Sequence, residues 1–107
     1  MSSRKNVASA EKELLAAIKA NPKAYKLRFS LAKFYEQIGS IDKVSQVYND
    51  IIDVDGDGKD GLQAKVKLAE LVFRQGNRTE ASRLTEEVLK ENPRDGEALI
   101  IKGKLAL

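Results

Sequence analysis

A nine-residue segment recurs in related form within the chain, and this internal repeat limits the possible folds more than any other feature. The segment Leu31–Gly39 reads LAKFYEQIG, and the segment Leu68–Gly76, which begins 37 residues later, reads LAELVFRQG. Both segments begin with Leu-Ala, continue to a pair of apolar residues and end with Gly. An incomplete third copy places Lys102-Gly103 in register with Leu68-Ala69. Self-similarity at this spacing is typical of stacked structural repeats.

Each repeated unit is predicted to form two amphipathic helices joined by a short turn. Apolar residues recur three and four positions apart, the spacing that places them on one helix face. In the first unit these residues are Leu27, Leu31, Phe34 and Ile38, then Ile41, Val44, Tyr48 and Ile51. Gly39 and Gly76 are placed to end the first helices in a left-handed conformation. Ser40, and Asn77 together with Glu80, are predicted to begin the second helices.

These residues resemble the tetratricopeptide repeat family, whose period is about 34 residues. The matching positions are Leu31, Ala32, Tyr35, Val44 and Tyr48 in the first unit, and Leu68, Ala69, Val72, Ala81, Val88 and Pro93 in the second. Arg28 and Lys65 depart from the pattern, because the family usually has an aromatic residue at this position. The resemblance implies an all-α fold, a right-handed superhelical array of antiparallel helix hairpins with about six helices.

The resemblance covers nearly the whole chain and divides it into four parts. Residues 25–58 and 62–95 correspond to whole repeats, residues 5–20 to the second helix of a partial repeat, and residues 96–107 to the first helix of another. We expect residues 1–107 to form a single domain. An array that begins and ends on half repeats is expected to be a fragment of a longer protein. The segment ENPRDGEAL is similar in style to bacterial repeat proteins.

The resemblance also implies a function. First helices of tetratricopeptide repeats line a concave groove, so we expect a non-enzymatic scaffold that binds a protein or peptide there. The family's groove positions correspond to Lys26, Phe29, Lys33, Gln37, Val66, Glu70, Phe73, Ile100 and Lys104, with Glu36, Gln63, Arg74 and Glu97 beside them. Apolar members are expected to anchor the partner, and the lysines to pair with its acidic groups. The alternative is a structural spacer of a longer superhelix whose inner face binds nothing.

Composition excludes several classes of site. The chain has no His and no Cys, which removes His-containing triads, Cys nucleophiles, the usual zinc ligands and disulfides, and we expect no cofactor. The net charge of +3 comes from 19 basic and 16 acidic residues that are interspersed along the chain. Nucleic-acid-binding proteins usually concentrate basic residues on one face, so no nucleic-acid partner is expected.

No apolar run approaches the roughly 18 residues that a membrane span requires, so we expect no membrane span. A soluble chain of this kind is assigned to the cytoplasm by default, with the bacterial periplasm as the alternative if a secreted parent protein contains it.

The expected last helix, within residues 96–107, is rich in apolar side chains. They are Leu99, Ile100, Ile101 and Leu105, and no further helix follows to cover them. Leaving one such side chain in water forfeits roughly 1.5–3 kcal/mol. A homo-oligomer formed through this helix is therefore the alternative to a missing neighbouring repeat.

The acidic segment Asp53–Gly61 lies where the spacing between repeats lengthens. Its carboxylates alternate as in the first half of an EF-hand calcium loop, at Asp53, Asp55 and Asp57. Ala64 stands where such a loop places its bidentate Glu, so the match covers only half of the loop. The segment is either a weak calcium site or an enlarged turn in which Asp60 and Gln63 cap the next helix.

Overall fold

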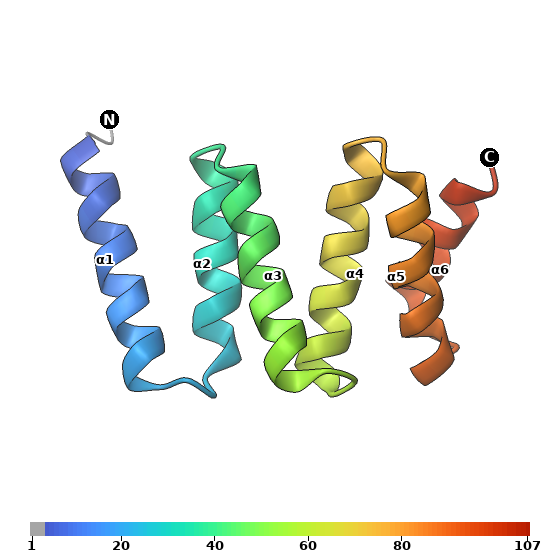
Figure 1. Cartoon of the computed structure of the whole chain (residues 1–107), viewed down its shortest axis with the longest axis horizontal. Coiled ribbons are helices and arrows are strands. Elements are labelled where there is room, and N and C mark those ends of the chain that lie inside the picture. The colour runs from blue at the N-terminus through green and yellow to red at the C-terminus, as the bar shows by residue number, and fades with distance from the viewer. Residues whose placement is uncertain (1–3) are drawn as a thin grey trace. The chain divides into compact units, whose positions relative to one another are not determined.

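The computed structural model describes the backbone of residues 4–107 and the side chains from Asn6 onward. This described part contains six α-helices and no β-strand, which confirms the predicted all-α fold. The helices are α1 (Arg4–Ala20), α2 (Tyr25–Gln37), α3 (Ile41–Asp55), α4 (Lys59–Arg74), α5 (Arg78–Glu91) and α6 (Gly96–Leu105) (Figure 1). The chain divides into two compact units, unit 1 (Met1–Val47) and unit 2 (Tyr48–Leu107).

Glycine ends α2 and α4, as the sequence predicts. Gly39 has a φ of 79° and Gly76 a φ of 87°, in the left-handed region that only glycine adopts at no steric cost. After each glycine, the next N–H donates to the carbonyl oxygen five residues earlier, at 2.9 Å beyond Gly39 and 2.8 Å beyond Gly76. This pairing satisfies carbonyl groups that a helix end leaves free. Pro22 and Pro93 lie just beyond the ends of α1 and α5, where they cannot interrupt a helix.

Unit 1 contains α1, α2 and the first part of α3, and a polar cluster joins these three helices. The Tyr35 hydroxyl donates to Oε2 of Glu11 at 2.6 Å, and Nζ of Lys43 lies 3.3 Å from the same oxygen. The Lys43 ammonium also lies 5.4 Å from the centroid of the Tyr35 ring. Among the described side chains of α1 none is fully buried, and even Leu14 and Ile18 are only half-buried. Partial apolar contact and this cluster together hold α1 on α2.

The polar cluster shifts two pKa values. The hydrogen bond from Tyr35, followed by that from Lys43, lowers the pKa of Glu11 below its usual value. Burial and the hydrogen bond to Glu11 raise the pKa of Tyr35 to about 12. At neutral pH the cluster therefore holds a neutral phenol at Tyr35 and a carboxylate at Glu11.

Unit 2 contains the rest of α3 together with α4, α5 and α6. In this unit α5 contacts both α4 and α6, and α6 also contacts α4 directly (Figure 1). Side chains that are at most 2% exposed form its core, among them Ala64, Ala81, Leu84, Thr85, Val88, Ala98 and Ile101. The hydroxyl of Thr85 donates to the carbonyl oxygen of Ala81 at 2.6 Å, which satisfies the one polar group among them. Small residues at 81 and 98 permit close approach of neighbouring helices.

Candidate functional site: the furrow between α4 and α6

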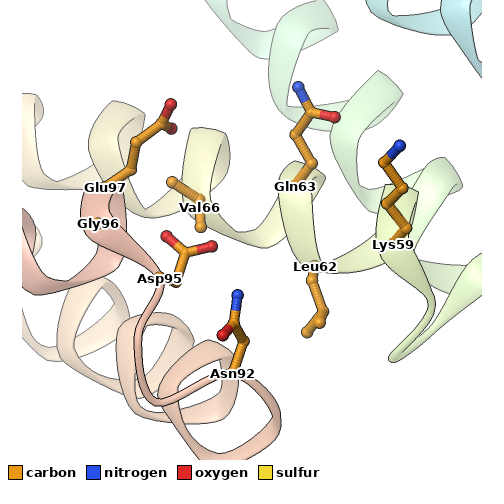
Figure 2. A pocket seen from close by; sticks show the side chains of 8 residues that line it. All are labelled: Lys59, Leu62, Gln63, Val66, Asn92, Asp95, Gly96 and Glu97. Carbon is orange, nitrogen blue, oxygen red and sulfur yellow. The ribbon is translucent and has the colours of Figure 1, made fainter.

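Two depressions lie along α4 and α6 in unit 2. The N-terminal depression has a volume of about 580 Å³ and is lined by Lys59, Leu62, Gln63, Val66, Asn92, Asp95, Gly96 and Glu97 (Figure 2). The C-terminal depression has a volume of about 240 Å³ and is lined by Glu70, Phe73, Arg74, Ile101 and Lys104. Each depression is lined by residues of both helices. The N-terminal depression lies near the N-terminal ends of α4 and α6, and the C-terminal depression lies near their C-terminal ends. We call the two depressions together the α4–α6 furrow.

The N-terminal depression has an apolar floor and a polar rim. Figure 2 shows the side chains of α4 on one side of it and the turn into α6 on the other. Val66 is only 2% exposed and therefore forms part of the floor. Asp95 precedes α6 and accepts a hydrogen bond from the N–H of Ala98 at 2.9 Å, which caps that helix. Lys59 and Glu97 are exposed and leave the rim open to solvent.

The C-terminal depression is built around the half-buried ring of Phe73. The guanidinium group of Arg78 lies 5.5 Å from the ring centroid, within the range of a cation–π contact. Arg78 also donates to the carbonyl oxygen of Leu105 at 3.0 Å. These two contacts fix the last turn of α6 and the ring of Phe73 to the start of α5. The ring is thereby held in place while it still lines the depression.

The two ends of the furrow differ in charge. Charged residues at the N-terminal depression are Lys59, Asp95 and Glu97, and those at the C-terminal depression are Glu70, Arg74 and Lys104. Acidic groups therefore prevail at one end and basic groups at the other. Within the described part of the chain, no ion pair engages the side chain of Arg74 or Lys104. Both cations are available to an incoming anion.

In unit 2 the structure places four of the five predicted groove residues at the two depressions, whereas Ile100 lines neither. Val66 lines the N-terminal depression, whereas Glu70, Phe73 and Lys104 line the C-terminal one. Ile100 is 61% exposed on α6, between the residues of α6 that line the two depressions. Partner binding at these positions is untested and stays a prediction.

In unit 1 all the predicted groove residues lie on α2. Lys26, Lys33 and Gln37 are exposed, and Phe29 is half-buried. Their spacing along the helix places them about one or two turns apart, so several can face solvent together.

Sequence patterns did not identify several residues that shape the furrow. The missed residues are Lys59, Leu62, Asn92, Asp95, Arg78 and Ile101. Asp95 could have been predicted from the sequence, since an Asp just before an apolar helical segment is a common N-cap. Arg78 had no such signal, because its hydrogen bond to Leu105 joins residues 27 positions apart in the chain.

The acidic segment between α3 and α4 forms a tight turn that uses its carboxylates internally. Oδ2 of Asp55 accepts the N–H of Gly61 at 2.8 Å, and Oδ1 of Asp57 lies 3.0 Å from Nζ of Lys65. In the described part of the chain, no three acidic side chains are grouped so that they could hold a metal ion. The prediction that Asp60 caps the next helix is wrong. That helix begins at Lys59, so position 60 already lies within its first turn, and the Asp55 carboxylate binds a free N–H instead.

Lys65 occupies a position where the family usually has an aromatic residue, and its surroundings explain this departure. Its side chain is only 7% exposed, and its Nζ lies 3.0 Å from Asp57 and 3.1 Å from Glu87. Burial opposes the charged form, but the hydrogen bonds to both carboxylates outweigh it and raise the pKa of Lys65. The long apolar stem fills the aromatic position, and the ammonium group ties the α3–α4 turn to α5.

The apolar side chains of α6 divide between its two sides. Ile101 is 2% exposed and belongs to the core, whereas Leu99 is 47% and Ile100 61% exposed. A β-carbon added at Gly96 or Gly103 would meet no atom within 4 Å, so both glycines lie in open space. Solvent-exposed α6 therefore presents Leu99 and Ile100 among the exposed charged residues Glu97, Lys102 and Lys104, and space is free around its two glycines.

Comparison with known proteins gives a match to one protein family. A family model described as tetratricopeptide repeat matches residues 3–52 and 66–107. Comparison with curated proteins gives no significant match. Of the helices that the structure describes, none has the length and apolar character needed to cross a membrane.

Proposed function

Because the chain belongs to the tetratricopeptide repeat family, we propose that it is a protein-interaction module that binds a peptide or helix of its partner along its first helices. Repeats of this family generally mediate protein–protein interaction and are typically non-enzymatic. We assign the whole repeats to residues 25–58 and 62–95, and the binding positions to the exposed faces of α2, α4 and α6.

The α4–α6 furrow is the observation that carries this proposal. It presents Phe73 in a fixed orientation beside two cations without ion-pair partners, Arg74 and Lys104. Binding energy at protein interfaces is concentrated on a few such anchors, with aromatic residues and Arg enriched among them. An ordered ring also loses little conformational entropy when a partner covers it.

The groove assignment is tested with a double variant, Phe29→Ala with Phe73→Ala. The chain is first used to isolate a partner from a cell extract, and affinity for the purified partner is then measured by calorimetry. We expect the double variant to bind at least about tenfold more weakly, the effect of losing one good anchor. Ile100→Ala removes a 61% exposed side chain with little effect on folding and should weaken binding in the same direction.

The matched control is Leu15→Ala with Val54→Ala, which removes apolar side chains that are 47% and 57% exposed outside the groove positions. It should leave affinity unchanged. If the groove variants bind as tightly as the wild type while retaining their helical circular-dichroism signal, the groove assignment is wrong. The spacer interpretation would then be preferred.

A second candidate is self-association through α6, which the exposure of Leu99 and Ile100 favours. Glu97 and Lys104 lie seven residues apart on this helix, about 10 Å along its axis. Two copies of α6 that pair in antiparallel fashion would therefore place opposite charges beside each other at both ends, around a central apolar contact. Sedimentation equilibrium tests this candidate. A dimer that Ile100→Lys dissociates supports it, and a monomer at millimolar concentration refutes it.

A further inference from the structure

The charge difference along the α4–α6 furrow specifies more than a general affinity for peptides. We propose that the furrow selects an extended segment with an acidic side chain at the C-terminal depression, an apolar side chain against Phe73 and a basic side chain at the N-terminal depression. This inference rests on the proposed function and adds the chemical class of its ligand.

The C-terminal depression has the composition of a carboxylate site. Arg74 from α4 and Lys104 from α6 line it together with Phe73 and Ile101, and the single carboxylate of Glu70 leaves an excess of positive charge there. A carboxylate between these cations can accept hydrogen bonds from both, and charge-assisted bonds of this kind are stronger than neutral ones. No ion pair within the described residues competes for either cation.

The opposite end of the furrow favours the opposite charge. Glu97 on the rim of the N-terminal depression is exposed and forms no ion pair in the described part of the chain. Asp95, which caps α6, places a second carboxylate there. Lys59 opposes these two carboxylates, which leaves an excess of negative charge. A basic side chain is complementary to this end.

The distance between the two depressions sets the shortest ligand that can reach both. Gln63 in the N-terminal depression and Arg74 in the C-terminal one both lie on α4, and at 1.5 Å per residue they are about 16 Å apart along the helix. An extended chain advances about 3.3 Å per residue, so about five residues cover the distance. A single segment of five or six residues can therefore reach both depressions.

Helix energetics offers another reason for basic residues at these positions. Arg74 lies in the last turn of α4 and Lys104 in the last turn of α6, where cations interact favourably with the helix dipole. That interaction needs only a positive charge near each helix end and predicts no ligand preference. Binding specificity therefore separates the two roles, whereas thermal stability alone does not.

The test uses fluorescein-labelled six-residue peptides with blocked ends and measures fluorescence anisotropy with the full chain. The acidic probe carries Lys at one end, Leu in the middle and two Glu at the other end. Its neutral counterpart replaces Glu by Gln, and its basic counterpart replaces Glu by Lys. We expect the acidic probe to bind about three- to tenfold more tightly than the neutral one at 50 mM salt. The preference should decrease at 500 mM salt, since screening shortens the range of the charges.

A charge reversal of the furrow gives the decisive comparison. In Arg74→Glu with Lys104→Glu, the basic probe should bind more tightly than the acidic one. The matched control, Lys23→Glu with Lys90→Glu, makes the same change in net charge at two exposed lysines outside the furrow. It should retain the preference for the acidic probe.

Other outcomes overturn the inference in distinguishable ways. If the control loses the preference as fully as the furrow variant, net charge alone determines binding. If a neutral peptide with a free C-terminus binds as tightly as the acidic probe, the furrow recognises a chain end rather than a side chain. If all probes bind equally and Phe73→Ala weakens them all, the ligand class is wrong but the proposed function stands. If neither probes nor the isolated partner respond to any furrow variant, both proposals fail.

Discussion

The two units of the molecule hold their helices together by different means. In unit 2, α5 contributes Ala81, Leu84 and Val88 to a core in which these side chains are at most 2% exposed. In unit 1, α1 contributes no fully buried side chain among its described residues, and a hydrogen bond between Tyr35 and Glu11 joins it to α2. Both units have the same kind of helices and the same glycine turns. Sequence periodicity therefore does not reveal how firmly a helix is held.

This difference has an energetic consequence. Apolar burial contributes roughly 25 cal/mol per Å² of area removed from water, and a close-packed core adds a penalty for any cavity. A partly exposed hydrogen bond contributes only about 0.5–1.5 kcal/mol, because water competes for both partners. We therefore expect α1 to open at a lower free energy than α5 does.

Substitutions of two leucines give the largest expected contrast. Leu84→Ala removes a side chain that is 2% exposed and should destabilise the protein by about 2–5 kcal/mol. Leu14→Ala removes a half-buried side chain from α1 and should cost only about 1 kcal/mol. Urea denaturation followed by circular dichroism measures both. Equal costs would show that the two units are packed equally well.

A pair of glycines gives the next contrast, now within unit 2. A β-carbon at Gly61 would lie 2.0 Å from the carbonyl oxygen of Gly56, so Gly61→Ala forces the backbone of the α3–α4 turn apart. We expect a loss of about 1–3 kcal/mol, as for other overpacked sites. Gly103→Ala is the control, because it lies in open space on α6 and should stabilise the helix by about 0.5–1 kcal/mol. Opposite signs in thermal denaturation support the geometry of the turn, and two stabilised variants contradict it.

Removal of the Tyr35 hydroxyl tests the polar cluster of unit 1. Tyr35→Phe should cost about 0.5–1.5 kcal/mol near neutral pH. The pKa of Glu11 is lowered, so its contribution is present above its unfolded pKa and is lost as the pH falls through the folded value. The pKa of Tyr35 is raised to about 12, so its contribution is complete below its unfolded pKa, about 10, and is lost as the pH rises through 12.

The stability difference between wild type and Tyr35→Phe should therefore be largest between about pH 5 and pH 9 and should shrink in acid and in strong base. Denaturation curves across this range measure it. A difference that stays constant with pH would mean that Glu11 does not accept this hydrogen bond.

Calcium gives the smallest expected effect. Asp55 and Asp57 already bind Gly61 and Lys65, so an ion would have to displace both partners. We expect no heat in calorimetry with millimolar Ca²⁺ and no shift in melting temperature. Measurable binding that Asp53→Asn abolishes would restore the calcium site as an alternative.

The sequence was sufficient to predict the features that depend on local pattern. Gly39 and Gly76 end helices because the left-handed conformation is a property of the residue itself, and Oδ1 of Asn77 accepts the N–H of Glu80, a contact between residues three positions apart. The features it did not predict depend on residues that are distant along the chain. The sequence shows only that Lys65 departs from the family pattern. The structure gives the reason, because Asp57 and Glu87 pair with its ammonium group.

The candidate site shows the same limit. Repeat positions grouped Glu70, Phe73 and Lys104, which line one depression, because each first helix presents the same face at the same spacing. They did not indicate Arg78, whose contacts to Phe73 and Leu105 depend on how α4, α5 and α6 pack together. Charge polarity along the furrow likewise appears only when the turn into α6 is placed beside α4.

Chemical-shift mapping tests the central claim, that the α4–α6 furrow is a binding surface, most directly. The isotope-labelled chain is titrated with the acidic probe, and backbone amide signals are followed by NMR. We predict that the largest shifts fall within residues 63–74 and 96–104, with little change along the exposed face of α5 at Arg83 and Lys90. Shifts that cluster on α5, or that are spread evenly over unit 2, would contradict the assignment of the furrow as the binding site.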